Sequence, residues 1–344
     1  MTFVKRQSAR RQDIITIRAL AIFLVMLGHS IIIYSSGWDL YSTTQTSWVL
    51  DHLKNTINMV QMPLFFSVSG FCLVFTLNSK HGLSVIDKSK RLLIPFFTVG
   101  LLWMLPIRLL VRYQGYVGKS LWHIILIDII MGKDNGHLWF LPTLMIIFLI
   151  LIGVKKWVAI FKWPDWSFDL LSAFLAISVL ITVNIFPEVD SIPYIGQLCR
   201  NFIYFYIGYF WHCHEEQIRP VKSVAGKISI GLLLFSLCIL SWIGMPVPSC
   251  FLAVFSMLMV VCVYELIPNW SCKPVQIVSA NSMGLYLFHS PLLYISFTLW
   301  PDISPYLMLT VNLVGWGLCA FAVTELLRRF RMGFVLGEFC SRTL

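Results

Sequence analysis

Long apolar runs recur along the whole 344-residue chain, and they constrain its fold more than any other feature. Each run is about twenty residues long, the length that an α-helix needs to cross the hydrocarbon core of a bilayer. Hydrophobic residues make up 58% of the chain and charged residues only 12%, too few to cover a soluble domain of this size. Because a backbone in lipid must satisfy its own hydrogen bonds, the runs predict an all-α, polytopic membrane helical bundle.

Hydropathy predicts about ten transmembrane helices in one domain that covers residues 1–344. A basic tail at 1–13 precedes them and a short tail at 328–344 follows. The apolar stretch 120–131 is too short to span, so we expect it in the outer interface or folded back into the bundle. The spans are predicted at 14–35, 57–78, 92–112, 137–154, 168–186, 199–212, 228–244, 250–267, 278–299 and 306–327.

The distribution of basic residues predicts the orientation of these spans. If the N-terminal tail is cytoplasmic, most of the 26 lysines and arginines fall into cytoplasmic loops. Both termini are then cytoplasmic. The same distribution accounts for the net charge of +10, so we expect a lipid bilayer and no nucleic acid as partner.

The first span carries two polar side chains, Arg18 and His29, that a bilayer core disfavours. At 3.6 residues per turn they lie within roughly 20° on one helix face and about 16 Å apart along the axis. We interpret Arg18 as a cytoplasmic site for a phosphate or carboxylate, and His29 as a general base deep in the membrane. The alternative is structural: Arg18 snorkels to the headgroups and His29 bonds a neighbouring helix.

Two further stretches near the cytoplasmic side are candidates for ligand binding. The stretch 61–71 contains a proline and a Ser-x-Ser-Gly sequence, which favour a packing kink and close approach of another backbone, although Ser69 could line a cavity. Lys88 and Arg91 lie where span three begins. Their charge alone favours a topogenic anchor, and the functional alternative is a clamp for a phosphate ligand such as coenzyme A.

Three residues are candidates on the outer side or in mid-membrane. His137 and Trp139 open span four, where aromatic residues commonly anchor a helix at the interface, and His137 could equally orient a polar acceptor. His289 lies near the middle of span nine, as a cavity residue or as an interhelical histidine that is already hydrogen-bonded. No group of His and Cys residues has the spacing of a metal site, so we expect no metal.

Five motifs in order resemble the acyltransferase-3 family of bacterial membrane O-acyltransferases. Their order and spacing fit this family over essentially the whole chain. They are Arg18 with ten residues before His29, the Met-Pro-Leu-Phe-Phe…Ser-Gly-Phe stretch at 62–71, the Leu-Ile-Pro at 93–95, the His-Leu-Trp-Phe-Leu at 137–141 and the Tyr-Leu-Phe-His at 286–289.

The resemblance implies an enzyme that takes an acyl group, usually acetyl, from cytoplasmic acyl-coenzyme A. It passes this group through the bundle to a sugar hydroxyl of a surface polysaccharide, such as O-antigen or exopolysaccharide, or of its lipid-linked precursor. By this analogy Arg18 holds the coenzyme A end and His29 is the essential base or a transient acyl carrier. The acceptor side is then shaped by His137, Trp139 and His289. Acyl-coenzyme A is a donor substrate, no cofactor is bound permanently, and the location is the bacterial inner membrane.

Two departures from the family and one other function class stay open. The family often has Arg-x-x-Arg where this chain has Lys88 and Arg91, and lysine makes a point contact where arginine makes a bidentate fork. The chain has no room for a hydrolase-like domain, so we expect direct transfer to the acceptor, unless a separate protein takes the acyl group. The alternative is a transporter or flippase for a lipid-linked sugar, with Arg18 binding pyrophosphate.

Overall fold

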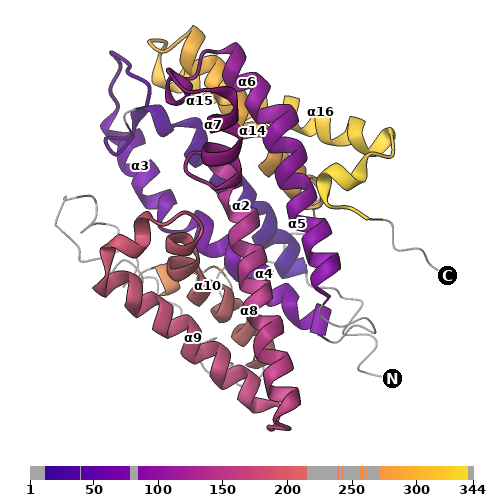
Figure 1. Ribbon diagram of the computed structural model, residues 1–344. Coiled ribbons are helices and arrows are strands. Elements are labelled where there is room, and N and C mark those ends of the chain that lie inside the picture. The colour runs from indigo at the N-terminus through magenta and orange to yellow at the C-terminus, as the bar shows by residue number, and fades with distance from the viewer. Residues whose placement is uncertain are drawn as a thin grey trace.

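A computed structural model describes residues 12–38, 40–77, 84–214 and 272–339, together with single positions between 239 and 263 (Figure 1). All regular structure in these ranges is helical. The all-α prediction is therefore confirmed. The predicted spans at 228–244 and 250–267 lie outside the described residues except for those single positions.

Five helical stretches in the described part are long and apolar enough to cross a membrane. They coincide with predicted spans two to five and with span ten, and they confirm a membrane helical bundle. The number ten stays a prediction. The stretches are Trp48–Leu77, Val85–Leu110, Gly136–Ile160, Trp166–Ile185 and Pro305–Arg329.

Short π-helical or 3₁₀ segments divide several of these stretches into separate helices. The bounds are α3 (Trp48–Asn58), α4 (Gln61–Leu77), α5 (Val85–Val99), η2 (Gly100–Met104), α6 (Leu105–Leu110), η5 (Gly136–Trp139), α8 (Phe140–Ile160), α9 (Trp166–Ile185), α15 (Pro305–Thr310), η8 (Val311–Gly315) and α16 (Trp316–Arg329).

Helices also form where spans one, six and nine are predicted. These are α2 (Gln12–Ser30), α10 (Ile195–His214), and the pair α13 (Lys273–Ala280) and α14 (Ser282–Leu299). The stretch 120–131 forms α7 (Leu121–His123) and the π-helical η4 (Ile124–Ile130). The short 3₁₀ segments are η1 (Ile32–Tyr34), η3 (Gln114–Tyr116), η6 (Pro187–Ser191) and η9 (Gly333–Leu336).

Helix α2 packs against five other helices and so lies inside the bundle. It contacts α3, α4, α13, α14 and α15, while α10 packs against α4, α8 and α9. In Figure 1 α9 runs along the edge of the molecule beside α8.

Two glycines let α4 and α10 touch backbone to backbone. A Cβ on Gly70 would lie 1.8 Å from the Phe205 carbonyl oxygen, and one on Gly208 would lie 1.9 Å from the Ser67 carbonyl oxygen. Small residues allow this kind of close approach in membrane bundles. The close backbone approach predicted for the Ser-x-Ser-Gly stretch is thus present.

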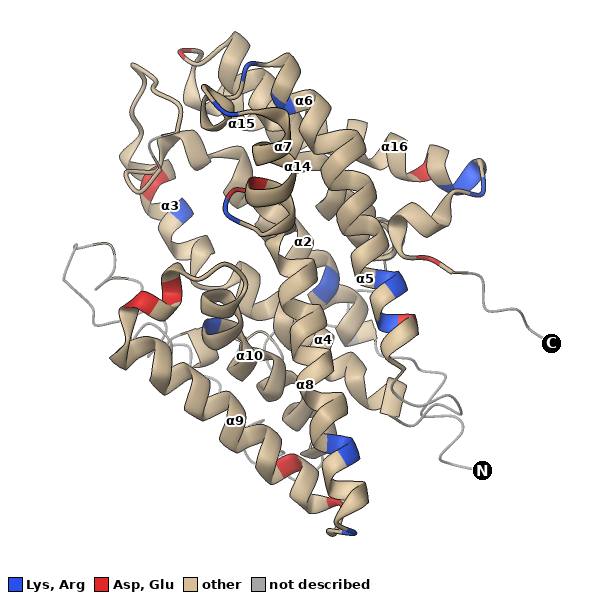
Figure 2. Cartoon of the chain, in the orientation of Figure 1, with Lys and Arg blue, Asp and Glu red and all other residues tan. Residues whose placement is uncertain are grey.

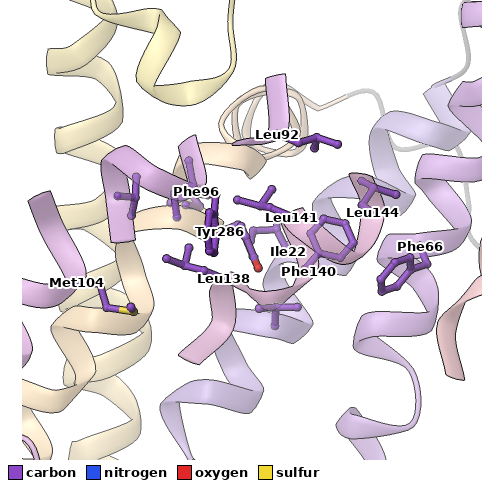
Figure 3. Close-up of a cluster of buried hydrophobic side chains, with 14 of the residues drawn as sticks. Ile22, Phe66, Leu92, Phe96, Met104, Leu138, Phe140, Leu141, Leu144 and Tyr286 are labelled. Carbon is purple, nitrogen blue, oxygen red and sulfur yellow. The ribbon is translucent and has the colours of Figure 1, made fainter. Parts of the chain in front are cut away.

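Tyr286 of α14 lies in the middle of the apolar core. Figure 3 shows its ring surrounded by Phe96, Leu138, Leu141 and Ile22, which come from four other elements. The Tyr286 hydroxyl donates a hydrogen bond to the His137 carbonyl oxygen, so its polar end is satisfied. This core fixes α14 against η5 and α8.

Candidate functional site

His29 and His289 face each other across the contact between α2 and α14. His29 Nδ1 lies 2.9 Å from His289 Nε2, although the two residues are 260 positions apart in the chain. The rings are nearly parallel, with an interplanar angle of 9° and centroids 5.2 Å apart. The structure thus brings together two histidines that the sequence singles out separately.

The α14 backbone determines where the protons of a neutral pair reside. His289 Nδ1 lies 2.6 Å from the Leu285 carbonyl oxygen and 3.1 Å from that of Tyr286. A carbonyl only accepts, so His289 carries its proton on Nδ1 and has a lone pair on Nε2. His29 must then donate through Nδ1, and its own lone pair is on Nε2. His29 Nε2 is therefore the basic nitrogen of the pair.

His137 joins this pair from η5. Its ring centroid lies 5.8 Å from that of His289, at an interplanar angle of 63°. His137 Nε2 donates to the Leu287 carbonyl oxygen at 3.1 Å, so the lone pair of the neutral ring is on Nδ1. Three histidines from three separate elements thus converge in the middle of the bundle.

A cavity of about 250 Å³ opens beside these histidines. His29, His137 and Trp139 all line it, whereas His289 lies behind His29. Its walls combine aromatic faces with a few polar groups, the pattern of a pocket for a polar ligand. The lining residues are His29, Ile32, Trp38, Leu40, Tyr113, Asp134, Gly136, His137, Trp139, Ser290, Leu293, Tyr294 and Phe297.

Arg108 braces one wall of the cavity. Its side chain is fully buried and its Nη1 donates to the Asp134 carbonyl oxygen at 2.9 Å and to Asp134 Oδ1 at 3.3 Å. Its Nη2 donates to the Tyr294 hydroxyl at 3.1 Å. Gly136, at φ +57°, leaves room for the guanidinium, because a Cβ there would lie 2.6 Å from Nη2.

Asp134 brings a carboxylate to the edge of the cavity. Its side chain is 26% exposed, and the Tyr113 hydroxyl donates to Oδ2 at 3.0 Å. Neither Asp134 nor Arg108 belongs to the motifs that the sequence singles out. The signal available was an arginine within an otherwise apolar run, which is costly unless the residue is buried and paired.

The residues that are predicted to bind the acyl donor lie apart from the cavity, next to one side of α4. Arg18 Nη2 lies 4.0 Å from Cys72 Sγ, and Lys88 Nζ donates to the Thr76 hydroxyl at 3.3 Å. Cys72 and Thr76 are one helical turn apart, so the two cations approach neighbouring positions of α4. Ser69 lies one turn before Cys72, and its hydroxyl donates to the Phe65 carbonyl oxygen at 3.0 Å.

Arg91 follows Lys88 by one turn of α5 and is exposed. Lys88 by contrast is turned into the bundle, with Nζ 4.2 Å from the centroid of the Phe148 ring. Figure 2 shows these basic residues on α5 and further ones toward the end of α8. The basic entry to span three is thus divided between an inward lysine and an outward arginine.

The described residues hold no group of three or more His, Cys, Asp or Glu side chains arranged for a metal ion. The continuous helix α2 places Arg18 about 16 Å from His29 along the axis. The site therefore has two parts, which are basic groups near the start of α2 and a histidine cavity near its end.

A comparison with protein families decides the family. The family model described as an acyltransferase domain matches residues 11–326. The chain belongs to the acyltransferase-3 family. The resemblance carried by the five sequence motifs is thus confirmed, and the protein is a membrane acyltransferase. No curated protein and no solved structure matches this acyltransferase significantly.

Proposed function

We propose that this membrane acyltransferase transfers an acyl group, in the simplest case acetyl, from cytoplasmic acyl-coenzyme A to a hydroxyl of a carbohydrate at the outer side. The observation that carries the proposal is the pair of His29 and His289, which leaves a lone pair on a histidine that lines a cavity. A base within reach of an acceptor hydroxyl is what O-acyl transfer requires.

In the proposed step His29 Nε2 takes the proton of the acceptor hydroxyl while the hydroxyl oxygen attacks the thioester carbonyl carbon. The new C–O bond forms, the C–S bond breaks, and the leaving thiolate takes the proton from His29. His289 Nε2 accepts a hydrogen bond from the Nδ1–H of the transient imidazolium and so holds the ring in place. A covalent acyl-His29 intermediate is the less favoured variant.

The cavity supports a carbohydrate as acceptor. Trp38, Trp139 and Phe297 offer aromatic faces against which the C–H face of a sugar ring packs. The Asp134 carboxylate accepts hydrogen bonds from the sugar hydroxyls, and Arg108 balances the charge of Asp134. A surface polysaccharide or its lipid-linked precursor, such as an O-antigen or exopolysaccharide unit, has these features.

The basic groups near the start of α2 support a phosphate-bearing donor. Arg18 and Lys88 approach the same stripe of α4, and Arg91 is exposed close by. A donor held there must reach about 16 Å along α2 to His29, which suits the long pantetheine arm of coenzyme A. Placing these groups in the cytoplasm follows the positive-inside rule and puts both termini on the cytoplasmic side of the bacterial inner membrane.

The first experiment uses the full chain in lipid nanodiscs with radiolabelled acetyl-coenzyme A and membrane glycolipid extract. We expect label transfer by the wild type, loss of transfer by about 10²–10⁴-fold in His29→Ala, and weaker donor affinity in Arg18→Ala. His123→Ala is the matched control, because His123 is an exposed outer histidine. Folded wild type that moves lipid-linked sugar but neither binds nor cleaves the donor would be a transporter instead.

A further inference from the structure

Lys54 is a buried cation on α3. Only 3% of its surface is exposed, and its Nζ donates to Asn58 Oδ1 at 2.7 Å. Among the residues that the structure describes, no carboxylate pairs with it. A charged group inside a membrane bundle is costly and is by default a functional candidate. The ammonium keeps two further N–H donors for a ligand.

The hydrogen bonds around Lys54 also leave one acceptor without a partner. Because an ammonium only donates, Asn58 must present Oδ1 to it. That same oxygen accepts from Gln61 Nε2 at 2.9 Å, so the Gln61 amide must point its oxygen the other way. Gln61 Oε1 is buried and has no hydrogen-bond partner among the described residues, in a side chain only 5% exposed. Such orphaned acceptors require an explanation.

The unused donor and the unused acceptor lie at one place beside His29. A Cβ on Gly28 would lie 2.7 Å from Gln61 Oε1 and 3.4 Å from Lys54 Nζ. Gly28 directly precedes His29 on α2, so both polar groups lie next to the turn that carries His29. The missing side chain of Gly28 is what allows both polar groups to approach the reacting end of α2.

We propose that Lys54 and Gln61 form a subsite for a secondary amide carried by one of the two reactants. Lys54 Nζ donates to the amide carbonyl oxygen, and Gln61 Oε1 accepts from the amide N–H. A secondary amide is neutral and satisfies both groups at once. A hydroxyl group also accepts and donates, but in that case neither series described below shows a preference for the amide. An oxyanion would use Lys54 alone and leave Gln61 Oε1 unpaired. The inference rests on the proposed function, because it assumes that His29 is where the acyl group changes hands.

Two reactants can supply such an amide. In an acyl-coenzyme A donor, an amide nitrogen follows the thioester sulfur after two methylene groups, so it reaches the level of Gly28 when the thioester is at His29. In an acceptor, the acetamido group of an amino sugar has the same chemistry. The experiment therefore varies the donor and the acceptor separately.

The donor series compares S-acetyl-N-acetylcysteamine with its oxoester analogue, S-acetyl-O-acetylmercaptoethanol, in the full chain in nanodiscs. The two differ only in N–H against O, so the oxoester keeps the carbonyl and loses the donor. We expect wild type to prefer the amide by about tenfold in kcat/KM, the effect of one unsatisfied buried acceptor. The acceptor series compares methyl glucoside with methyl N-acetylglucosaminide, with acetyl-coenzyme A as donor.

Two variants separate the roles of the residues. In Gln61→Leu the preference for the amide should fall to near unity, because the acceptor is gone. In Lys54→Met, kcat/KM should fall by about tenfold for both thioesters. The ratio between the two should stay the same, because each keeps the carbonyl oxygen that Lys54 binds. Lys133→Met, at an exposed outer lysine, should change neither. Size-exclusion profiles report whether each variant is folded.

A tenfold preference in either series that disappears in Gln61→Leu supports the amide subsite, and the series in which it occurs identifies the reactant. Equal rates for both members of both series in the wild type overturn the subsite, even where no variant folds. Absence of any turnover with acetyl-coenzyme A in folded wild type instead contradicts the proposed function, so the two failures are distinguishable.

Discussion

His29 Nδ1 donates a hydrogen bond to His289 Nε2 over 2.9 Å. Through this bond the α14 backbone determines which nitrogen of His29 is basic. The Leu285 carbonyl holds the proton on His289 Nδ1, which leaves Nε2 as an acceptor. A ring that is oriented and held in one tautomer by a second group is the arrangement that general-base catalysis uses.

The first prediction concerns His289. His289→Leu removes the acceptor for the His29 Nδ1 proton, so kcat should fall by about 10²-fold while KM for the donor stays unchanged. His289→Gln can accept that proton through its side-chain oxygen and should retain most of the activity. Single-turnover kinetics of both variants checks this, and equal activity in the two variants would show that the hydrogen bond does not matter.

The second prediction concerns the ion pair of the buried Arg108 with Asp134. Asp134→Asn leaves the fully buried guanidinium without its counter-charge, which should lower the free energy of unfolding by about 3–5 kcal/mol. Asp190→Asn breaks a pair with Arg200, whose own side chain is 58% exposed and stays hydrated, so it should cost less than about 1 kcal/mol. Thermal unfolding of both variants in the same detergent makes the comparison, and similar losses would contradict a structural role for Arg108.

The sequence was sufficient for the parts of the site that lie on one helix. The helix α2, with Arg18 and His29 about three turns apart, follows from an apolar run of spanning length, which is a strong local signal. The partner of His29 was not predictable, because His289 is 260 positions away and only packing of α14 on α2 brings it there. Arg108 was missed for the same reason, since Tyr294 is 186 positions from it.

The start of span two shows where hydropathy alone is insufficient. It predicts a start at 57, whereas the helix begins at Trp48, after Ser47 caps it by accepting from the Leu50 N–H. Lys54 and Asn58 lower the hydropathy of this first part. Lys54 is nevertheless buried because α3 packs against α2, a long-range contact that a sliding window does not contain.

The third prediction separates the phosphate end of the donor from its acyl end. Arg18→Met should raise KM for acetyl-coenzyme A by about tenfold or more, because a charge-assisted contact to phosphate is lost. The same variant should leave KM for S-acetyl-N-acetylcysteamine unchanged, because that donor has no phosphate. Steady-state kinetics with both donors checks this. Equal effects on the two donors would place Arg18 in another role.

The fourth prediction concerns the loop between η1 and α3, in which Trp38 and Leu40 line the cavity. Asp302 accepts from the Thr44 backbone N–H at 2.7 Å and from its hydroxyl at 2.8 Å, and these hydrogen bonds lower the pKa of Asp302. A lowered pKa means that this tether is complete above the ordinary value of 3.8 and weakens as pH falls through the folded-state pKa.

Hydrogen exchange at the Thr44 amide measures the strength of this tether. The wild type should keep the amide protected from neutral pH down to about pH 4, and protection should fall only below that. Asp302→Ala should lose protection already at pH 7. Protection that falls between pH 7 and pH 5 in the wild type would assign the tether to another group.

The fifth prediction tests the crossing of α4 and α10. Gly70→Ala and Gly208→Ala each place a methyl group within 2 Å of a backbone carbonyl oxygen, which cannot move aside as a side chain can. Each should cost about 3 kcal/mol or more, in the range of severe overpacking. Gly153→Ala is the matched control, because a Cβ there meets nothing within 4 Å and an alanine in α8 should stabilise by about 0.5–1 kcal/mol. The unfolding midpoints of the three variants test this prediction. A Gly70→Ala variant as stable as the wild type would mean that α4 and α10 separate more easily than their contact indicates.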